Sequence, residues 1–268
     1  MQRAISLGVA GAAGRMGTEL CRMLAGSAEF APSCALDVVK VGQDWGVASG
    51  IDAIGVEITD NIEVFLASNP DVIVDLSIGD AAAVNVPVML QSGARVIVGA
   101  TGIKNEVLES FERTALTHGG RCIVVPNFSI GANLMIAMAR KAAPYYPAVE
   151  IVERHHPGKK DAPSGTALFT VSEIAAANPN IASTPVEHES VTGVRGGILN
   201  DIRIHSIRMP GTLAEQTVTF GCPGETLEIT HRSVSRDCFM LGVILAIKFI
   251  LDAEPGLTIG LDQVMGLI

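Results

Sequence analysis

Residues Leu7–Leu20 read LGVAGAAGRMGTEL, in which four glycines stand three residues apart. An apolar run of strand character leads into them, and a segment of helical composition begins near Arg15. Residues without a Cβ atom let the backbone approach a pyrophosphate, and the N–H groups at the start of a helix attract its negative charge. Glycines also occur in ordinary tight turns, so the motif alone leaves both interpretations open.

The sequence around this motif alternates short apolar runs with helical segments. It predicts strands at Ala4–Val9, Ser33–Val38, Val72–Leu76, Arg95–Gly99 and Arg121–Val125, and helices at Arg15–Leu24, Ile62–Ala67, Ala81–Gln91 and Lys104–Thr117. Runs such as VIVDL are apolar throughout, which is typical of a parallel sheet covered on both faces. We therefore predict an α/β fold with an N-terminal Rossmann-like, doubly wound parallel sheet. The segment Val41–Thr59 is rich in glycine, and we expect a loop there with room for one short strand.

A carboxylate, Asp37, stands at the end of the second predicted strand, about twenty residues after the glycines, and favours dinucleotide binding over a simple turn. Ligands of open α/β sheets lie beyond the carboxyl ends of the strands, so the ends of two further strands are expected to reach the cofactor. The predicted cofactor-binding residues are Gly11, Ala12, Ala13, Gly14, Arg15, Met16, Asp37, Gly99, Ala100, Thr101, Val125, Pro126, Asn127 and Phe128.

The pattern changes after Asn127. Helices are predicted at Ala132–Ala143 and Ser164–Ala177, and strands at Val149–Arg154, Asp201–Met209, Glu215–Cys222 and Thr226–Arg232. The last three strands are joined by Pro-Gly turns and read as an antiparallel meander. We expect an inserted α+β domain with a mostly antiparallel sheet at 128–235, and a dinucleotide-binding domain made of 1–127 with 236–268.

Composition narrows the possible partners. The chain has 268 residues and a formal net charge of −9, which argues against general nucleic-acid binding. Five dispersed cysteines without a C-x-x-C pair fit a reducing cytoplasm. The start of the chain has no long apolar run before a cleavage site, so we expect no signal peptide. The apolar run Phe239–Leu251 is too short to span a bilayer and carries Lys248, so we expect a buried helix and no membrane partner.

The densest cluster of charge is ERHHPGKKDAPSGTA, residues Glu153–Ala167. Ser164 is predicted to cap the helix that Gly165 and Thr166 open, where backbone N–H groups can face an anion. Lys159 can supply a counter-charge, and His155 is of the type that transfers protons near neutral pH.

Two other interpretations compete for this stretch. A run of charges is often only a solvated loop. A metal site is disfavoured because His155 and His156 would point to opposite sides of a continuing strand. We expect no metal.

The stretch EIVERHHPGKKDAPSGTA, Glu150–Ala167, resembles the E-x-x-E-x-H-x-x-x-K-x-D-x-P-S-G-T-A signature of the dihydrodipicolinate reductase family. The resemblance extends over the whole chain through VAGAAGRMG, VGATG, VPNFSIGANLM and LEITHRSVSR. It implies the reduction of dihydrodipicolinate, formed from 4-hydroxy-tetrahydrodipicolinate, to tetrahydrodipicolinate in lysine and diaminopimelate biosynthesis. The reductant would be NADH or NADPH.

The resemblance also implies roles for individual residues. His155 matches the proton donor and Lys159 the second catalytic group, while His156, Gly165 and Thr166 match positions that hold the carboxylates of the substrate. With Ser164 as the cap of the same helix start, the predicted substrate-binding residues are His156, Ser164, Gly165 and Thr166. The family is usually a homotetramer assembled through the sheet of the second domain, so that domain is expected to bind substrate and to oligomerise.

One departure from the family pattern bears on the cofactor. Many members carry arginine directly after the acidic residue of the second strand, where this chain has Val38. We therefore expect NADH to be preferred over NADPH. Two alternatives remain: a non-catalytic dinucleotide-binding sensor, which would leave His155 and Lys159 unexplained, and an amino-acid dehydrogenase on the same fold.

Overall fold

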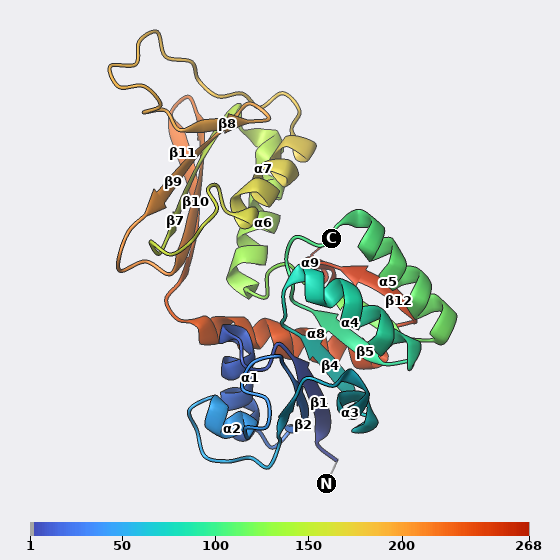
Figure 1. The fold of residues 1–268 in the computed structure, drawn as a ribbon. Coiled ribbons are helices and arrows are strands. Elements are labelled where there is room, and N and C mark those ends of the chain that lie inside the picture. Colours follow the sequence, from blue (N-terminus) through green and yellow to red (C-terminus); the bar gives the residue numbers. More distant parts are fainter. Residues whose placement is uncertain (1–2, 268) are drawn as a thin grey trace. The chain divides into compact units, whose positions relative to one another are not determined.

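The computed structural model describes residues 3–267, so the outer ends of the predicted first domain, residues 1–2 and 268, lie outside the described residues. The described chain divides into two compact units, which Figure 1 shows as ribbons. The first unit is built from the chain up to Phe128 together with Phe239–Gly266, and the second mainly from Ser129–Cys238. Each unit has its own sheet and its own hydrophobic core.

The first unit contains a parallel sheet of seven strands within the described residues, in the order β12-β6-β5-β4-β1-β2-β3. The strands are β1 (Ile5–Ala10), β2 (Phe30–Leu36), β3 (Ile58–Thr59), β4 (Val72–Asp75), β5 (Arg95–Val98), β6 (Arg121–Val124) and β12 (Gly256–Ile259). The predicted doubly wound parallel sheet is therefore confirmed. Strand β12 was not predicted: its four residues, GLTI, lack the continuous apolar run of the other strands.

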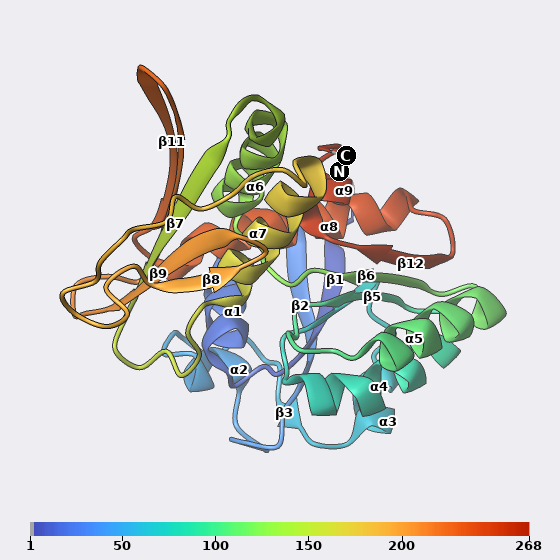
Figure 2. The ribbon, with the colours of Figure 1, turned by 90° about the horizontal axis from the view of Figure 1, so that it is seen from above.

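Helices cover both faces of this sheet, as Figure 2 shows from above. They are α1 (Arg15–Ala25), α2 (Trp45–Ala48), α3 (Ile62–Ala67), α4 (Gly79–Gln91), α5 (Asn105–His118), α8 (Met240–Asp252) and α9 (Leu261–Val264). Helices α3, α4 and α5 pack with the strands in one core cluster that includes Phe65, Met89 and Phe111. Helix α8 contacts β4, β5, β6 and α1. Coverage on both faces explains why the strands are apolar throughout.

The second unit contains a five-stranded mixed sheet within the described residues, in the order β11-β10-β7-β9-β8. Its strands are β7 (Ala148–His155), β8 (Gly197–Leu199), β9 (Ile202–Arg208), β10 (Ala214–Cys222) and β11 (Glu225–Ser233). Helices α6 (Ile130–Ala142) and α7 (Gly165–Ala177) pack against one face, and the turns η1 (Ala143–Tyr145) and η2 (Arg236–Phe239) complete the unit.

The predicted meander of the last three strands is right for β10 and β11, which pair antiparallel, and wrong for β9, which does not pair with β10. Strand β7 lies between β9 and β10, parallel to β9 and antiparallel to β10. Its helix-facing residues Val149 and Ile151 are buried and pack between the apolar residues of both neighbours, which makes β7 the central strand. The Pro210-Gly211 turn signal marks a change of chain direction, but it carries no information about which strand becomes the partner.

The segment Val41–Thr59, expected to be a loop, is organised around Asp44 and Trp45. Asp44 caps α2 by accepting a hydrogen bond from the Val47 N–H at 3.1 Å, and it accepts another from the Gly55 N–H at 2.7 Å. Trp45 is completely buried, and its indole Nε1–H donates to the carbonyl of Ala12 at 2.9 Å. The only tryptophan of the chain thus holds the glycine loop in place through a hydrogen bond to its backbone.

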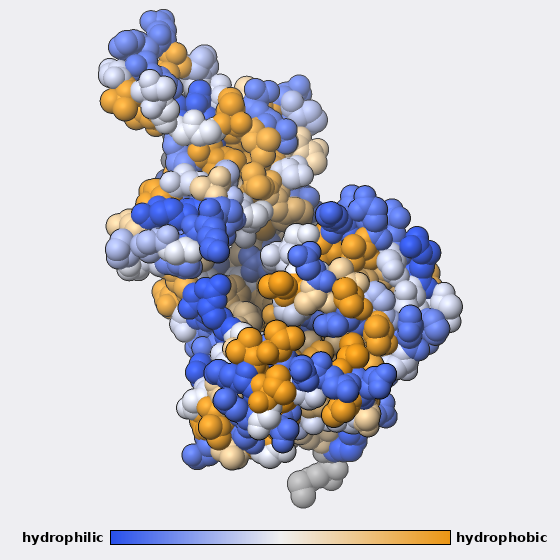
Figure 3. Space-filling model, in the orientation of Figure 1, coloured by the Kyte–Doolittle hydropathy of each residue, from blue (hydrophilic) through white to orange (hydrophobic). Residues whose placement is uncertain are grey.

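The face of the molecule in Figure 3 carries apolar side chains interspersed with polar ones on both units. No helix among residues 3–267 is long and apolar enough to cross a membrane.

Replacing Trp45 by phenylalanine should lower the free energy of unfolding. The variant keeps an aromatic ring but leaves the buried Ala12 carbonyl without its donor, which costs about 1–3 kcal/mol. Urea unfolding followed by circular dichroism measures the change. Val47→Ala on the same helix is the control, because Val47 is 58% exposed and its loss should change stability by less than about 0.5 kcal/mol. Equal stability of the two variants would contradict the assigned role of the indole N–H.

Candidate active site

The glycine loop follows the carboxyl end of β1 and packs closely against the backbone of neighbouring segments. Gly11 has φ +73°, and a Cβ atom there would lie 2.6 Å from the carbonyl carbon of Leu76. A Cβ atom at Gly17 would collide with the carbonyl oxygens of Gly11 and Ala12. Both glycines are therefore required by packing, and they bring the start of α1 directly against the loop.

The start of α1 is suited to an anion. Its cap is Gly14, and no side chain within residues 3–267 caps the helix. The backbone N–H groups of the first turn have no acceptor within the helix itself, and the helix dipole favours a negative group there. Arg15 adds a positive side chain at the first position. The start of α1, within the predicted cradle Gly11–Met16, is therefore chemically able to hold an anion.

Asp37 lies beside this cradle, immediately after β2. One of its carboxylate oxygens accepts a hydrogen bond from the Ala13 N–H at 2.9 Å, and the other accepts one from the Val39 N–H at 3.0 Å. Val38 follows with 85% of its side chain exposed. The amine of Lys40 donates to the carbonyl of Ala48 at 2.6 Å. The surroundings of Asp37 therefore present a carboxylate and an exposed apolar side chain, while the nearby lysine is engaged elsewhere.

The other predicted strand ends also meet. Gly99 follows β5, and a Cβ atom there would lie 2.6 Å from the ring of Phe128, which follows β6 and is buried. Ala100 is buried as well, and the Val125 N–H donates to the Val98 carbonyl at 2.8 Å. These contacts place Gly99–Thr101 and Val125–Phe128 on neighbouring strands at the carboxyl edge of the sheet.

The end of β4 was missed by the sequence analysis. Asp75 is completely buried, and its carboxylate accepts hydrogen bonds from the N–H and hydroxyl of Ser77, at 2.8 and 2.5 Å. Burial raises the pKa of the Asp75 carboxyl, although the bonds from Ser77 oppose the rise. The available signal was the polar residue that ends an otherwise apolar strand.

In the second unit, His155 ends strand β7 beside a buried carboxylate. Nδ1 of His155 contacts the carboxylate of Glu153, whose side chain is completely buried. Arg208 on β9 forms an ion pair with the same carboxylate at 2.9 Å. Burial alone would raise the pKa of Glu153, but hydrogen bonds from His155, Ser206 and Arg208 outweigh it and hold the pKa below its ordinary value. Glu153 is therefore an anion in contact with the imidazole.

The loop after β7 carries the predicted lysine. The amine of Lys159 pairs with the carboxylate of Asp161 at 2.9 Å, and the Lys159 N–H donates to the His156 carbonyl at 3.1 Å. The guanidinium of Arg208 donates to the Asp161 carbonyl at 2.7 Å. Arg208 thus contacts both Glu153, the partner of His155, and Asp161, the partner of Lys159. The sequence analysis assigned no role to Glu153 or to Arg208.

Ser164 caps α7 as predicted, because its buried hydroxyl accepts a hydrogen bond from the Ala167 N–H at 3.2 Å. Helix α7 then begins at Gly165, followed by Thr166. One turn further along α7, the Thr170 hydroxyl accepts a hydrogen bond from the Gln216 amide on β10 at 2.7 Å. The N–H groups of this helix start can hold an anion, and an imidazole such as that of His155 can supply a proton. The described residues contain no group of three or more side chains that could hold a metal ion.

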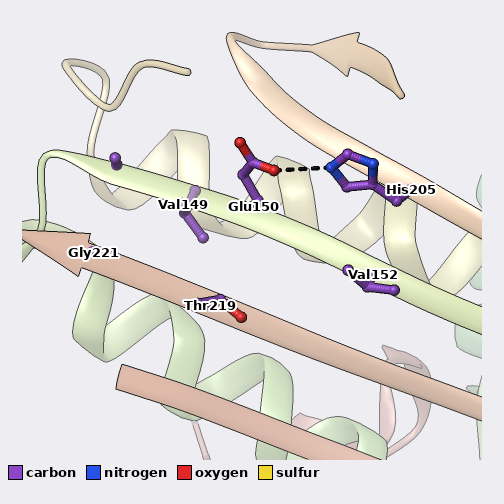
Figure 4. A pocket seen from close by; sticks show the side chains of 7 residues that line it. Val149, Glu150, Val152, His205, Thr219 and Gly221 are labelled. Atoms are coloured by element: carbon purple, nitrogen blue, oxygen red, sulfur yellow. Dashed lines mark hydrogen bonds and ion pairs between the residues drawn. The ribbon is translucent and has the colours of Figure 1, made fainter. Parts of the chain in front are cut away.

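The face of this sheet away from α6 and α7 contains a separate hollow of about 440 Å³ (Figure 4). Glu150 and His205 stand on its rim, with the imidazole Nε2 2.9 Å from a carboxylate oxygen, and Arg195 forms an ion pair with the other oxygen. The lining residues are Ala148, Val149, Glu150, Val152, His205, Thr219 and Gly221.

Two family models match the chain. The model described as "Dihydrodipicolinate reductase, N-terminus" matches residues 5–128, and the model described as "Dihydrodipicolinate reductase, C-terminus" matches residues 131–265. A curated protein of Carboxydothermus hydrogenoformans, named 4-hydroxy-tetrahydrodipicolinate reductase, is 39% identical over 95% of this chain and 97% of its own length.

Solved structures agree with these matches. "Dipicolinate bound Dihydrodipicolinate reductase from Paenisporosarcina sp. TG-14" superposes with a TM-score of 0.84 and 34% identity, covering 97% of this chain and 99% of that one. An amine dehydrogenase from Mycobacterium smegmatis superposes with a TM-score of 0.64 over 96% of this chain and 95% of that one, but it is only 12% identical and shares the fold alone.

Proposed function

Since the chain belongs to the dihydrodipicolinate reductase family, we propose which of its residues carry out the family's reaction and which nicotinamide they use. The protein is an NAD(P)H-dependent oxidoreductase of lysine and diaminopimelate biosynthesis. It reduces dihydrodipicolinate, derived from 4-hydroxy-tetrahydrodipicolinate, to tetrahydrodipicolinate. The observation that carries the assignment of roles is the contact of His155 Nδ1 with the buried Glu153, whose register partner Gln216 is hydrogen-bonded to Thr170 of α7.

The substrate is a dicarboxylate, so it needs a site for each negative group. The first turn of α7 supplies one through the backbone N–H groups at Gly165 and Thr166, where the helix dipole also favours an anion. Ser164 holds this turn in place as its cap. Lys159 and His156 supply positive or hydrogen-bonding groups for the other carboxylate. Asp161 now pairs with Lys159, and an incoming carboxylate would compete for the same amine.

The reaction ends with a proton transfer. Addition of hydride to the conjugated imine builds electron density in the ring, which protonation then discharges. We assign the proton to His155, whose Nδ1 is engaged by Glu153, so that Nε2 is the nitrogen available to the substrate. Lys159 orients the ring through its carboxylate and stabilises the negative charge.

The first unit holds the nicotinamide cofactor, which supplies the hydride. We propose that the cradle Gly11–Met16 binds the pyrophosphate and that Asp37 accepts hydrogen bonds from the hydroxyls of the adenosine ribose. Residues Gly99–Thr101 and Val125–Phe128, at the ends of the next strands, line the remainder of the cofactor site. The preference for NADH follows from Asp37, which repels a 2′-phosphate, and from the apolar Val38 next to it.

We also propose a homotetramer in the cytoplasm. The second sheet carries helices on one face, while the other contains the hollow lined by Val152, Thr219 and Gly221. Apolar side chains on this unit, including those of Ile198 and Val194, are more than half exposed and suit burial between copies of the chain. The five cysteines are free thiols, as is usual in a reducing compartment.

Replacing His155 by glutamine should lower kcat by about 10²–10⁴, the usual contribution of a positioned general acid. Cofactor affinity should change little, because the cofactor residues belong to the other unit. Oxidation of NADH in the presence of freshly generated substrate gives kcat, and fluorescence titration gives the affinity. His188→Gln, at an exposed histidine of the same unit, is the control and should behave as wild type. A kcat near the wild-type value in His155→Gln would remove His155 from the mechanism.

The cofactor preference predicts a higher kcat/KM with NADH than with NADPH. Val38→Arg should move the ratio toward NADPH by about tenfold, since one charged hydrogen bond to a 2′-phosphate contributes about 1.5 kcal/mol. Val64→Arg adds the same charge at a 57% exposed position of α3 and should leave the ratio unchanged. Equal or higher wild-type values with NADPH would show that Lys40 or Arg15 reaches the phosphate despite Asp37.

The proposed assembly predicts a mass of about 112 kDa in multi-angle light scattering, four times the 28.0 kDa of one chain. Val152→Asp would place a charge inside the hollow and should shift the mass toward smaller species, because a buried unpaired carboxylate is costly. Val64→Asp is the matched control on the first unit. A wild-type mass of 28 kDa would rule the tetramer out.

A further inference from the structure

Glu153 occupies an unusual place for a carboxylate. The helix-facing side of β7 continues from Val149 and Ile151 to Glu153 and His155, so the first two residues belong to the hydrophobic core and the acid directly extends it. The Glu153 side chain is completely buried. Moving a carboxylate out of water is costly unless charged or hydrogen-bonding groups replace the water, so its partners decide what it does.

Those partners come from two strands. His155, two residues further along β7, contacts one carboxylate oxygen through Nδ1, and Arg208 on β9 pairs with the other oxygen at 2.9 Å. Ser206, which lies opposite Glu153 in the β7–β9 register, adds a hydrogen bond. Because Nδ1 faces the carboxylate, the proton on that nitrogen is held, and exchange with a substrate is left to Nε2.

Few other charges face His155 within the described residues. The following loop contributes His156 and the Lys159–Asp161 pair. Strand β10 contributes the uncharged Gln216, whose own neighbour in β11 is His231, and α7 contributes Thr170, which accepts a hydrogen bond from Gln216. Arg154 and Glu215 alternate with these residues and so lie on the opposite face of the sheet. Glu153 is in direct contact with the imidazole ring through Nδ1.

We infer that Glu153 is a positioning residue of the reductase: its buried carboxylate engages Nδ1 of His155 and so fixes the ring with Nε2 as the nitrogen that passes a proton to the substrate. The inference rests on the proposed role of His155 as proton donor. In each turnover the Nε2 proton passes to the reduced ring and is replaced from solvent, while Glu153 stays ionised. Arg208 pairs with the same carboxylate and partly offsets its negative charge.

The test is the pH dependence of kcat/KM in Glu153→Gln. Glutamine keeps the size of the side chain and an oxygen that can accept from Nδ1–H, but it removes the charge. A catalytic acid works while it is protonated, so losing the neighbouring anion should move the fall of kcat/KM on the basic side to lower pH by about one unit or more. At pH 8 kcat should fall by about tenfold or more, while the KM for NADH should stay unchanged.

Three variants separate this role from a structural one. Glu215→Gln is the matched control, because Glu215 is also buried and paired with two arginines, Arg154 and Arg232, but on the other face of the sheet. It should leave the basic limb in place. Glu153→Asp retains the charge, so the basic limb of its kcat/KM profile should lie closer to that of the wild type than the limb of Glu153→Gln does. Arg208→Gln removes the moderating charge and should move the limb to higher pH, opposite to Glu153→Gln.

Failure of the inference is distinguishable from failure of the proposed function. If His155→Gln abolishes the basic limb but Glu153→Gln leaves it in place, His155 is the acid and Glu153 does not act through it. If His155→Gln changes neither kcat nor the limb, the proposed role of His155 is wrong. Should Glu153→Gln fail to fold, an unmoved limb in Arg208→Gln overturns the inference, and a limb moved to higher pH supports it.

Discussion

The cost of removing charge from water is the constraint on which the candidate active site depends. Two carboxylates, Asp75 and Glu153, are completely buried at the ends of strands in the two sheets. Each is held by groups from its immediate surroundings, Asp75 by Ser77 and Glu153 by His155 and Arg208. A buried carboxylate is stable only while its partners stay in hydrogen-bonding position, so the side chains that contact it are held in one orientation. In the second unit those groups include the proposed proton donor.

Much of the first unit could be predicted from sequence because the deciding signals are local. The glycines of Leu7–Leu20, the uniformly apolar VIVDL and the carboxylate at Asp37 each reflect contacts with near neighbours in one β-α-β repeat. The second sheet was predicted less well. The turn at Pro210-Gly211 suggested a hairpin, yet β7 separates the two strands that it joins. Strand partners depend on which strand is apolar enough to occupy the centre, and that is decided between segments distant in sequence.

The same distinction applies to the site. Ser164, Lys159 and His155 stand close together in the sequence and carry recognisable chemistry, so they could be predicted. Arg208 could not, since it lies on another strand and reaches Glu153 and the Asp161 carbonyl only through the parallel register of β7 and β9. Asp44 and Trp45 were missed for a similar reason, because their segment has no periodic pattern. It is ordered by the hydrogen bond from Trp45 to the glycine loop and by hydrogen bonds that Asp44 accepts within the segment.

The net charge of −9 appears at first to conflict with a dianionic substrate. Salt resolves the conflict, because at physiological ionic strength charges further apart than about 8 Å are largely screened. In the proposed site, an incoming carboxylate would therefore experience the local arrangement: the start of α7, Lys159 and His155. Glu153 is buried, contacts the imidazole of His155 and is paired with Arg208, which partly offsets its charge, so its charge acts mainly on these two neighbours. An acidic protein can thus attract an acidic substrate, provided that its own carboxylates near the site are paired, as Glu153 and Asp161 are.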